Sequence, residues 1–122
     1  MINFNKLKQS FKYAYRGVVY VFKNEQNFRL QILTGCIVVF LMIFFRVNRK
    51  EAILLVMIIM NVLVLEMINT VVEKLVDMLK PRIHFYAEII KNIMSAAVLS
   101  VSIGSVIVGI IVFWPYLISL KH

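Results

Sequence analysis

The chain has 122 residues, of which 61% are hydrophobic and only 16% are charged. This composition is too apolar for an ordinary soluble domain of this size and is typical of an integral membrane protein. The net charge of +8 indicates anionic lipid headgroups as neighbours, and not nucleic acid, because the charges flank apolar segments. The single cysteine, Cys36, excludes an internal disulfide and belongs to no metal or redox motif.

Residues 1–29 predict a basic amphipathic helix that lies in the membrane surface. Apolar side chains recur there at steps of three and four residues, and lysines and arginines occupy most of the remaining positions. The apolar positions are Phe4, Leu7, Phe11, Tyr15, Val18, Val19 and Phe22. The alternative is a soluble helix packed on a partner domain, which the basic amphipathic pattern does not favour.

Three apolar stretches follow, at residues 30–46, 51–79 and 92–115, and each predicts a transmembrane helix. The second is expected to extend beyond the bilayer into the cytoplasm, until Lys80-Pro81 ends it. The third is expected to end at Pro115. The sequence therefore predicts an all-α integral membrane protein, with one membrane domain over residues 1–122.

The distribution of Lys and Arg predicts the orientation. Six lie in the segment up to Arg29 and four in Lys74–Lys91, whereas Arg46–Lys50 contains three and the C-terminus contains Lys121. Under the positive-inside rule the N-terminus is cytoplasmic and the C-terminus lies outside. Three spans also make a thin bundle that can hardly shield polar groups from lipid, so we expect oligomerisation.

An acidic stripe on the second predicted span is the main candidate for chemistry. Glu66, Asn69, Glu73 and Asp77 are separated by three or four residues and therefore share one helical face. Glu73, nearer the water, is expected to hold a magnesium ion, and Glu66, deeper, to take a proton from a lipid hydroxyl. Asn69 lies between them and could orient either group. The alternative is that these groups only bond neighbouring helices.

Other polar residues carry weaker signals. Considered by pattern alone, Glu25 is an acid in a solvated turn, paired with Lys23 or Arg29, or else a second carboxylate folded over the site. Lys91 fits either a flanking lysine of the third span or a contact to a transferring phosphoryl group. His84 has no partner at metal-ligand spacing and reads as a surface or headgroup contact. No Gly-rich phosphate loop, zinc motif or nucleophile motif is present in the sequence.

Together these residues resemble a known family, the small bacterial membrane-integral diacylglycerol and undecaprenol kinases. The resemblance rests on Asn24-Glu25-x-x-Phe28-Arg29, Glu66-x-x-Asn69-x-x-x-Glu73-x-x-x-Asp77, His84 and Lys91-x-x-x-Ser95-Ala96-Ala97-Val98-Leu99. It implies ATP- and Mg²⁺-dependent phosphorylation of a lipid alcohol at the cytoplasmic interface of the bacterial membrane. It also implies a homotrimer of three-span protomers with sites between protomers.

The resemblance assigns roles to individual residues. Glu66 corresponds to the general base, and Glu25 and Glu73 to metal ligands. Asn69, Asp77 and Lys91 are expected beside the nucleotide and its phosphates.

Asn92 departs from the family pattern, which has Asp immediately after the Lys. The amide keeps the shape and loses the charge, so one alternative is a catalytically impaired, lipid-binding paralogue. A second alternative is a small proton-coupled transporter with Glu66 as its key acid. The pattern does not distinguish diacylglycerol from undecaprenol as the substrate.

Overall fold

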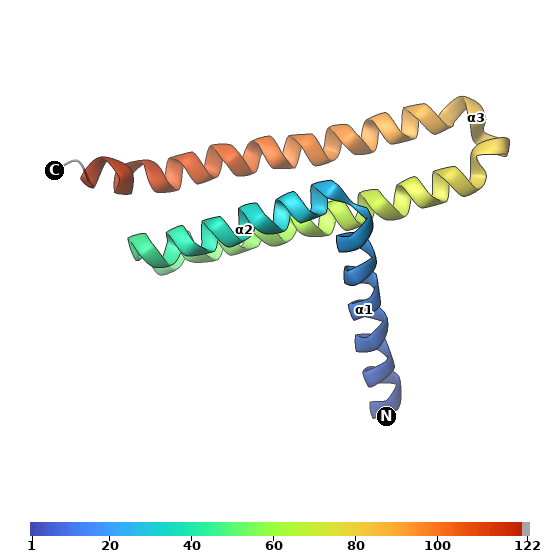
Figure 1. The fold of residues 1–122 in the computed structure, drawn as a ribbon, viewed down its shortest axis with the longest axis horizontal. Coiled ribbons are helices and arrows are strands. Elements are labelled where there is room, and N and C mark those ends of the chain that lie inside the picture. Colours follow the sequence, from blue (N-terminus) through green and yellow to red (C-terminus); the bar gives the residue numbers. More distant parts are fainter. Residues whose placement is uncertain (121–122) are drawn as a thin grey trace.

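The computed structural model describes residues 1–120, and all the regular structure in this range is helical. The elements are α1 (Phe4–Asn24), α2 (Gln26–Phe45) and α3 (Arg49–Ser119). Figure 1 shows α2 and both limbs of α3 running alongside one another, while α1 projects sideways from this bundle. The all-helical prediction is therefore confirmed for the described residues.

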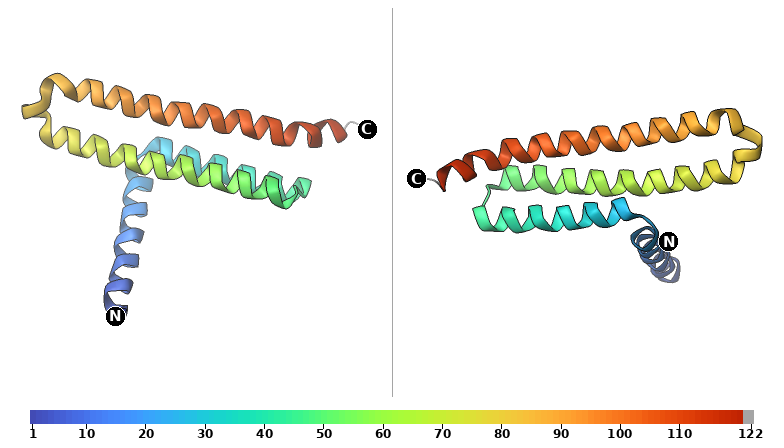
Figure 2. Two further views of the ribbon diagram at one scale, coloured as in Figure 1. Left: turned by 180° about the vertical axis from the view of Figure 1, so that it is seen from behind. Right: turned by 45° about the horizontal axis from the view of Figure 1, so that its top comes forward.

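The long helix α3 folds back on itself at Ile83. This residue has non-helical torsions, φ −113° and ψ 24°, and the chain reverses there. We call residues 49–82 the first limb and residues 84–119 the second limb; Figure 2 shows them side by side with α2 along the first. The sequence predicted a helix end at Lys80-Pro81, but Pro81 remains helical and the reversal falls two residues later. Proline removes one hydrogen-bond donor and restricts the preceding residue, which weakens the helix without fixing where it breaks.

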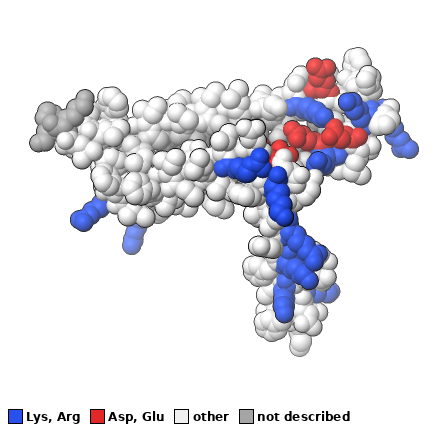
Figure 3. All heavy atoms as spheres, in the orientation of Figure 1, with Lys and Arg blue, Asp and Glu red and all other residues white. Residues whose placement is uncertain are grey.

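The α1 helix has the features expected of a surface helix. Its N-cap is Asn3, whose side chain accepts hydrogen bonds from the backbone N–H groups of Asn5 and Lys6. It ends at Asn24, and Glu25 alone separates it from α2. Figure 3 shows Lys and Arg side chains along its length, whereas the middle of the bundle carries almost no charge.

The α2 helix begins four residues earlier than the predicted span at 30–46. With 20 residues it is long enough to cross a bilayer. It ends at Phe45, and the next residue, Arg46, caps it in the left-handed conformation with φ 51°. Asn48 and Glu51 then form a capping box that starts α3.

The three helical segments meet at the end of the bundle opposite the reversal. Leu55, Val112 and Phe113 form a buried cluster there, and Phe45 packs against it. The hydroxyl of Tyr116 donates a hydrogen bond to Glu51 Oε1 at 2.6 Å and ties the two ends of α3 together. Pro115 does not end the helix as predicted, since the helix continues to Ser119.

Both α2 and α3 are long and apolar enough to cross a membrane. Their outward side chains are overwhelmingly large and apolar. Exposure of such side chains is unfavourable in water and favourable in lipid. Charged side chains gather instead on α1 and around the reversal of α3 (Figure 3). The fold therefore has an uncharged belt with a strongly charged region at one end.

Candidate active site

The Glu66 carboxylate lies in the interior of the bundle near its charged end. The residue is 1% exposed, and neither Oε1 nor Oε2 has a hydrogen-bond partner. A buried carboxylate without a partner is costly, so a native structure retains one mainly where function requires it. A single protomer therefore already buries this acid, whereas the sequence led us to expect that a bundle of three spans could hardly shield it from lipid.

Two polar neighbours on α3 are buried beside Glu66. Asn69 donates from Nδ2 to Glu73 Oε1 at 3.4 Å, and this long contact links the amide to the next carboxylate of the stripe. Thr70 donates from its hydroxyl to the Glu66 backbone carbonyl at 3.1 Å. Thr70 is not among the predicted site residues, although its position four residues after Glu66 predicts a bond of this kind.

Glu25 joins the site from the junction of α1 and α2. Its side chain is half-buried, and its charge acts on the Glu66 carboxyl together with that of Glu73. Glu25, at the junction, therefore lies close enough to Glu66 on α3 for their charges to interact. The proposed pairing of Glu25 with Lys23 or Arg29 is not found, since the only ion pair among residues 1–120 joins Lys91 and Asp77.

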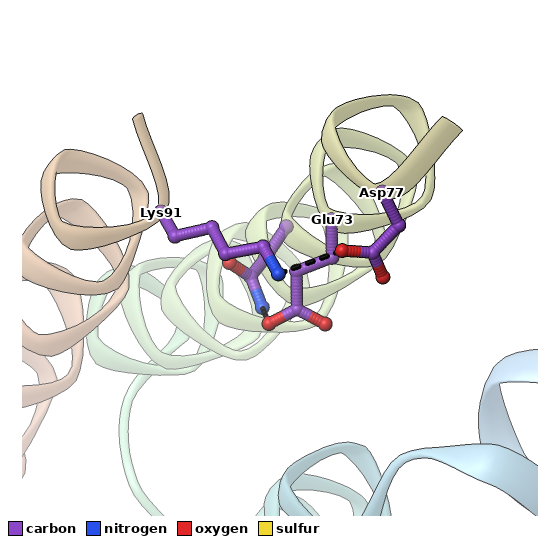
Figure 4. A network of polar contacts seen from close by, with 4 residues as sticks. Glu73, Asp77 and Lys91 are labelled. Carbon is purple, nitrogen blue, oxygen red and sulfur yellow. Dashed lines mark hydrogen bonds and ion pairs between the residues drawn. The ribbon is translucent and has the colours of Figure 1, made fainter. Parts of the chain in front are cut away.

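Lys91 reaches across from the second limb to the acidic stripe on the first. Its Nζ lies 2.7 Å from Asp77 Oδ1, and Figure 4 shows Lys91 and Asp77 facing each other with Glu73 close by. This contact is both a hydrogen bond and an ion pair, so it links the second limb to the acidic stripe of the first. Both side chains are partly open to solvent, which leaves the ammonium accessible to a charged ligand.

The remaining predicted residues, His84 and Asn92, lie at the same end of the bundle. Both are exposed: His84 follows the reversal at Ile83, and Asn92 is adjacent to Lys91. Neither forms a side-chain hydrogen bond with the residues that the structure describes up to position 120.

The donor set suits a magnesium ion shared with a phosphate ligand. Among the described residues, no group of three His, Cys, Asp or Glu side chains is arranged to enclose a metal. Magnesium usually takes one or two protein carboxylates and completes its shell with phosphates and water. Glu25 and Glu73, whose charges both act on the unpartnered carboxylate of Glu66, are carboxylates of the kind that such a shell uses.

The fold and the site together define a helical membrane protein with a carboxylate-rich site where the apolar belt meets the charged end. Residues 12–113 match the family described as prokaryotic diacylglycerol kinase. This match covers most of the chain, which therefore belongs to that family, a family of lipid kinases.

Curated relatives carry the same assignment. A diacylglycerol kinase from Synechocystis sp. is 35% identical over 91% of this chain, which spans 64% of that protein's length. An undecaprenol kinase from Bacillus subtilis is 27% identical over 93% of this chain and 92% of its own. A diacylglycerol kinase from Haemophilus influenzae is 35% identical over 86% of both chains. These names support a lipid kinase acting on diacylglycerol or undecaprenol.

Proposed function

We propose that this protein transfers the γ-phosphoryl group of ATP, with Mg²⁺, to the primary hydroxyl of a membrane lipid, either diacylglycerol or undecaprenol. The observation that carries this proposal is the buried, unpartnered Glu66 carboxylate, placed beside Glu25 and Glu73 at the charged end of an apolar bundle. A lipid hydroxyl reaches this depth from the bilayer, while ATP approaches from the water.

The residues divide the work of phosphoryl transfer, which depends mostly on positioning and charge neutralisation. Glu66 accepts the proton of the lipid hydroxyl as that oxygen attacks the γ-phosphorus, while the bond from the γ-phosphorus to the β-phosphate oxygen breaks and ADP leaves. Glu25 and Glu73 would hold Mg²⁺, which would neutralise phosphate charge. Asn69, bonded to Glu73, orients that carboxylate beside the nucleotide.

Lys91 supplies a positive charge to the phosphates. Its ammonium has three donors, so it keeps its bond to Asp77 Oδ1 at 2.7 Å and still has two donors for phosphate oxygens. Asp77 in this arrangement aims the lysine toward Glu73 (Figure 4).

An apolar groove supports a lipid as the acceptor. It measures about 690 Å³ and runs between α2 and the second limb of α3, over the first limb. Val62, four residues before Glu66, lines it together with Gln31 and Thr34 of α2. A hydrocarbon chain in this groove would place its hydroxyl end within about one helical turn of Glu66.

We further propose three spans per protomer, a cytoplasmic N-terminus and a homotrimer. The two limbs of α3 and α2 each provide one span, and α1 lies in the cytoplasmic surface among anionic headgroups. The exposed side chains on one face of the first limb support self-association, because they alternate steps of three and four residues as in a helical bundle. These are Leu54, Met57, Asn61, Val64, Ile68, Val71, Leu75 and Met78.

The test is phosphate transfer from γ-labelled ATP to diacylglycerol or undecaprenol, added separately to detergent-solubilised protein over a range of Mg²⁺ concentrations. Labelled lipid that depends on Mg²⁺ is the expected result, and the better substrate identifies the lipid class. Lipid binding without ADP release would instead indicate the impaired paralogue that Asn92 suggests. Proton-driven uptake into proteoliposomes without ATP use would indicate the transporter.

A further inference from the structure

The junction between α1 and α2 decides where Glu25 lies. Glu25 is the single residue between the two helices, with extended torsions of φ −116° and ψ 111°. Its backbone N–H donates to the Val21 carbonyl at 2.8 Å. A one-residue junction leaves the angle between two helices to a few torsions, so the position of the Glu25 carboxylate depends on whatever fixes that angle.

Arg29, one turn into α2, bonds back to the end of α1. Its Nη1 donates to the Phe22 carbonyl at 2.8 Å and to the Lys23 carbonyl at 3.0 Å. These oxygens belong to the last turn of α1, where backbone carbonyls have no partner within the helix. An unsatisfied carbonyl near hydrocarbon is costly, and a cation at a helix C-terminus is favourable, so both effects stabilise this contact.

The guanidinium does this without neutralising the carboxylate that it positions. Arg29 forms no ion pair with Glu25, since the ion pair of residues 1–120 joins Lys91 and Asp77. Arg29 therefore fixes the junction through backbone oxygens and leaves the charge of Glu25 available to a cation.

Apolar contacts anchor the junction but do not set its angle. Phe28 is 1% exposed and Val21 is 7% exposed, so both are buried at this point. Burial of this kind is non-directional, whereas two hydrogen bonds to adjacent carbonyls define an orientation. A further contact, Lys74 Nζ over the Tyr20 ring at 5.8 Å, ties α1 to the first limb of α3.

We propose that Arg29 is a positioning residue, whose two hydrogen bonds to the end of α1 hold the junction so that Glu25 lies beside Glu66. The consequence of this proposal for catalysis rests on the proposed function, in which Glu25 helps to bind Mg²⁺. The structural part of the proposal, the fixed angle of α1, is independent of that function.

The structural part is tested by the distance between spin labels at Ser10→Cys on α1 and Ser100→Cys on α3, in a Cys36→Ser background. Labelled protein is diluted into unlabelled protein so that each oligomer carries one labelled copy. We expect a narrow distance distribution for the parent and a broad one for Arg29→Ala. Arg16→Ala, which removes the same side chain from an exposed position of α1, is the matched control and should stay narrow.

The catalytic part is tested by the Mg²⁺ dependence of lipid phosphorylation. Loss of a group that orients a metal ligand typically costs about 10–100-fold in metal affinity or activity. We expect Arg29→Ala to raise the Mg²⁺ concentration for half-maximal activity by about this factor, with a smaller loss in Arg29→Lys, which keeps a charged donor. Thermal unfolding of each variant separates this effect from misfolding, and Arg29→Gln and Arg29→Lys carry the test if Arg29→Ala does not fold.

An unchanged distance distribution in Arg29→Ala would overturn the proposal. A broadened distribution with unchanged Mg²⁺ dependence would support the positioning of α1 and refute a metal-binding role for Glu25. A broadened distribution together with a higher Mg²⁺ concentration for half-maximal activity supports both the positioning of α1 and the metal-binding role of Glu25. If the parent protein shows no lipid kinase activity, that result would count against the proposed function and not against the positioning of α1.

Discussion

Replacing Glu66 by Gln removes the proposed base while keeping the shape of the side chain. Glu66 is 1% exposed and both of its oxygens lack partners, so no hydrogen bond is lost in the exchange. The new amide brings two unsatisfied donors, a cost of about 1–3 kcal/mol, which removal of a buried carboxylate offsets in part. We therefore expect Glu66→Gln to fold, with its unfolding temperature close to that of the parent.

The effect on catalysis should be far larger than the effect on stability. A positioned general base contributes about 10²–10⁴-fold to the rate, so phosphorylation by Glu66→Gln should fall by about that factor. The assay is transfer from γ-labelled ATP at saturating lipid and Mg²⁺, beside thermal unfolding and an ATP-binding measurement. Glu88→Gln, at an exposed glutamate of the second limb, is the control and should retain activity. A rate for Glu66→Gln within about threefold of the parent, small against the range expected for a base, would refute the assignment of Glu66 as the base.

Further predictions concern other parts of the chain. Lys91→Met should lower turnover by about 10²–10³-fold, because it removes the positive charge that faces the phosphates. Steady-state kinetics checks this, and the KM for lipid should stay unchanged. Asn61→Leu should shift the protomer–trimer equilibrium measured by sedimentation in detergent, since a polar group within an apolar seam specifies oligomeric state; an unchanged equilibrium would count against this seam. Gly35→Leu should lower the unfolding temperature, because a Cβ there already meets Ile59 Cγ2 at 3.2 Å and overpacking typically costs about 1–3 kcal/mol. Asn92→Asp should raise turnover if the missing charge limits the enzyme. Equal turnover in Asn92→Asp and the parent would show that Asn92 does not impair catalysis.

The amino-acid sequence determined the local features of this protein. Hydrophobic runs predicted the apolar helices, and the steps of three and four residues predicted both the amphipathic α1 and the shared face of Glu66 and Glu73. These features depend only on helical periodicity, which neighbouring residues specify by themselves. The resemblance to the family rested on short spacings that can be read directly along the chain, and the family match over residues 12–113 confirms it.

Only the tertiary structure decided which distant residues meet. Glu25 approaches Glu66 across the junction between α1 and α2, which the burial of Phe28 anchors and whose angle we propose Arg29 to hold. No periodicity encodes that angle. Lys91 meets Asp77 because α3 reverses at Ile83, beyond the proline where the sequence placed the end of the helix. Side chains that share a helix are related by a fixed rise and rotation, whereas contacts between helices depend on a few torsions at each junction, which packing must select.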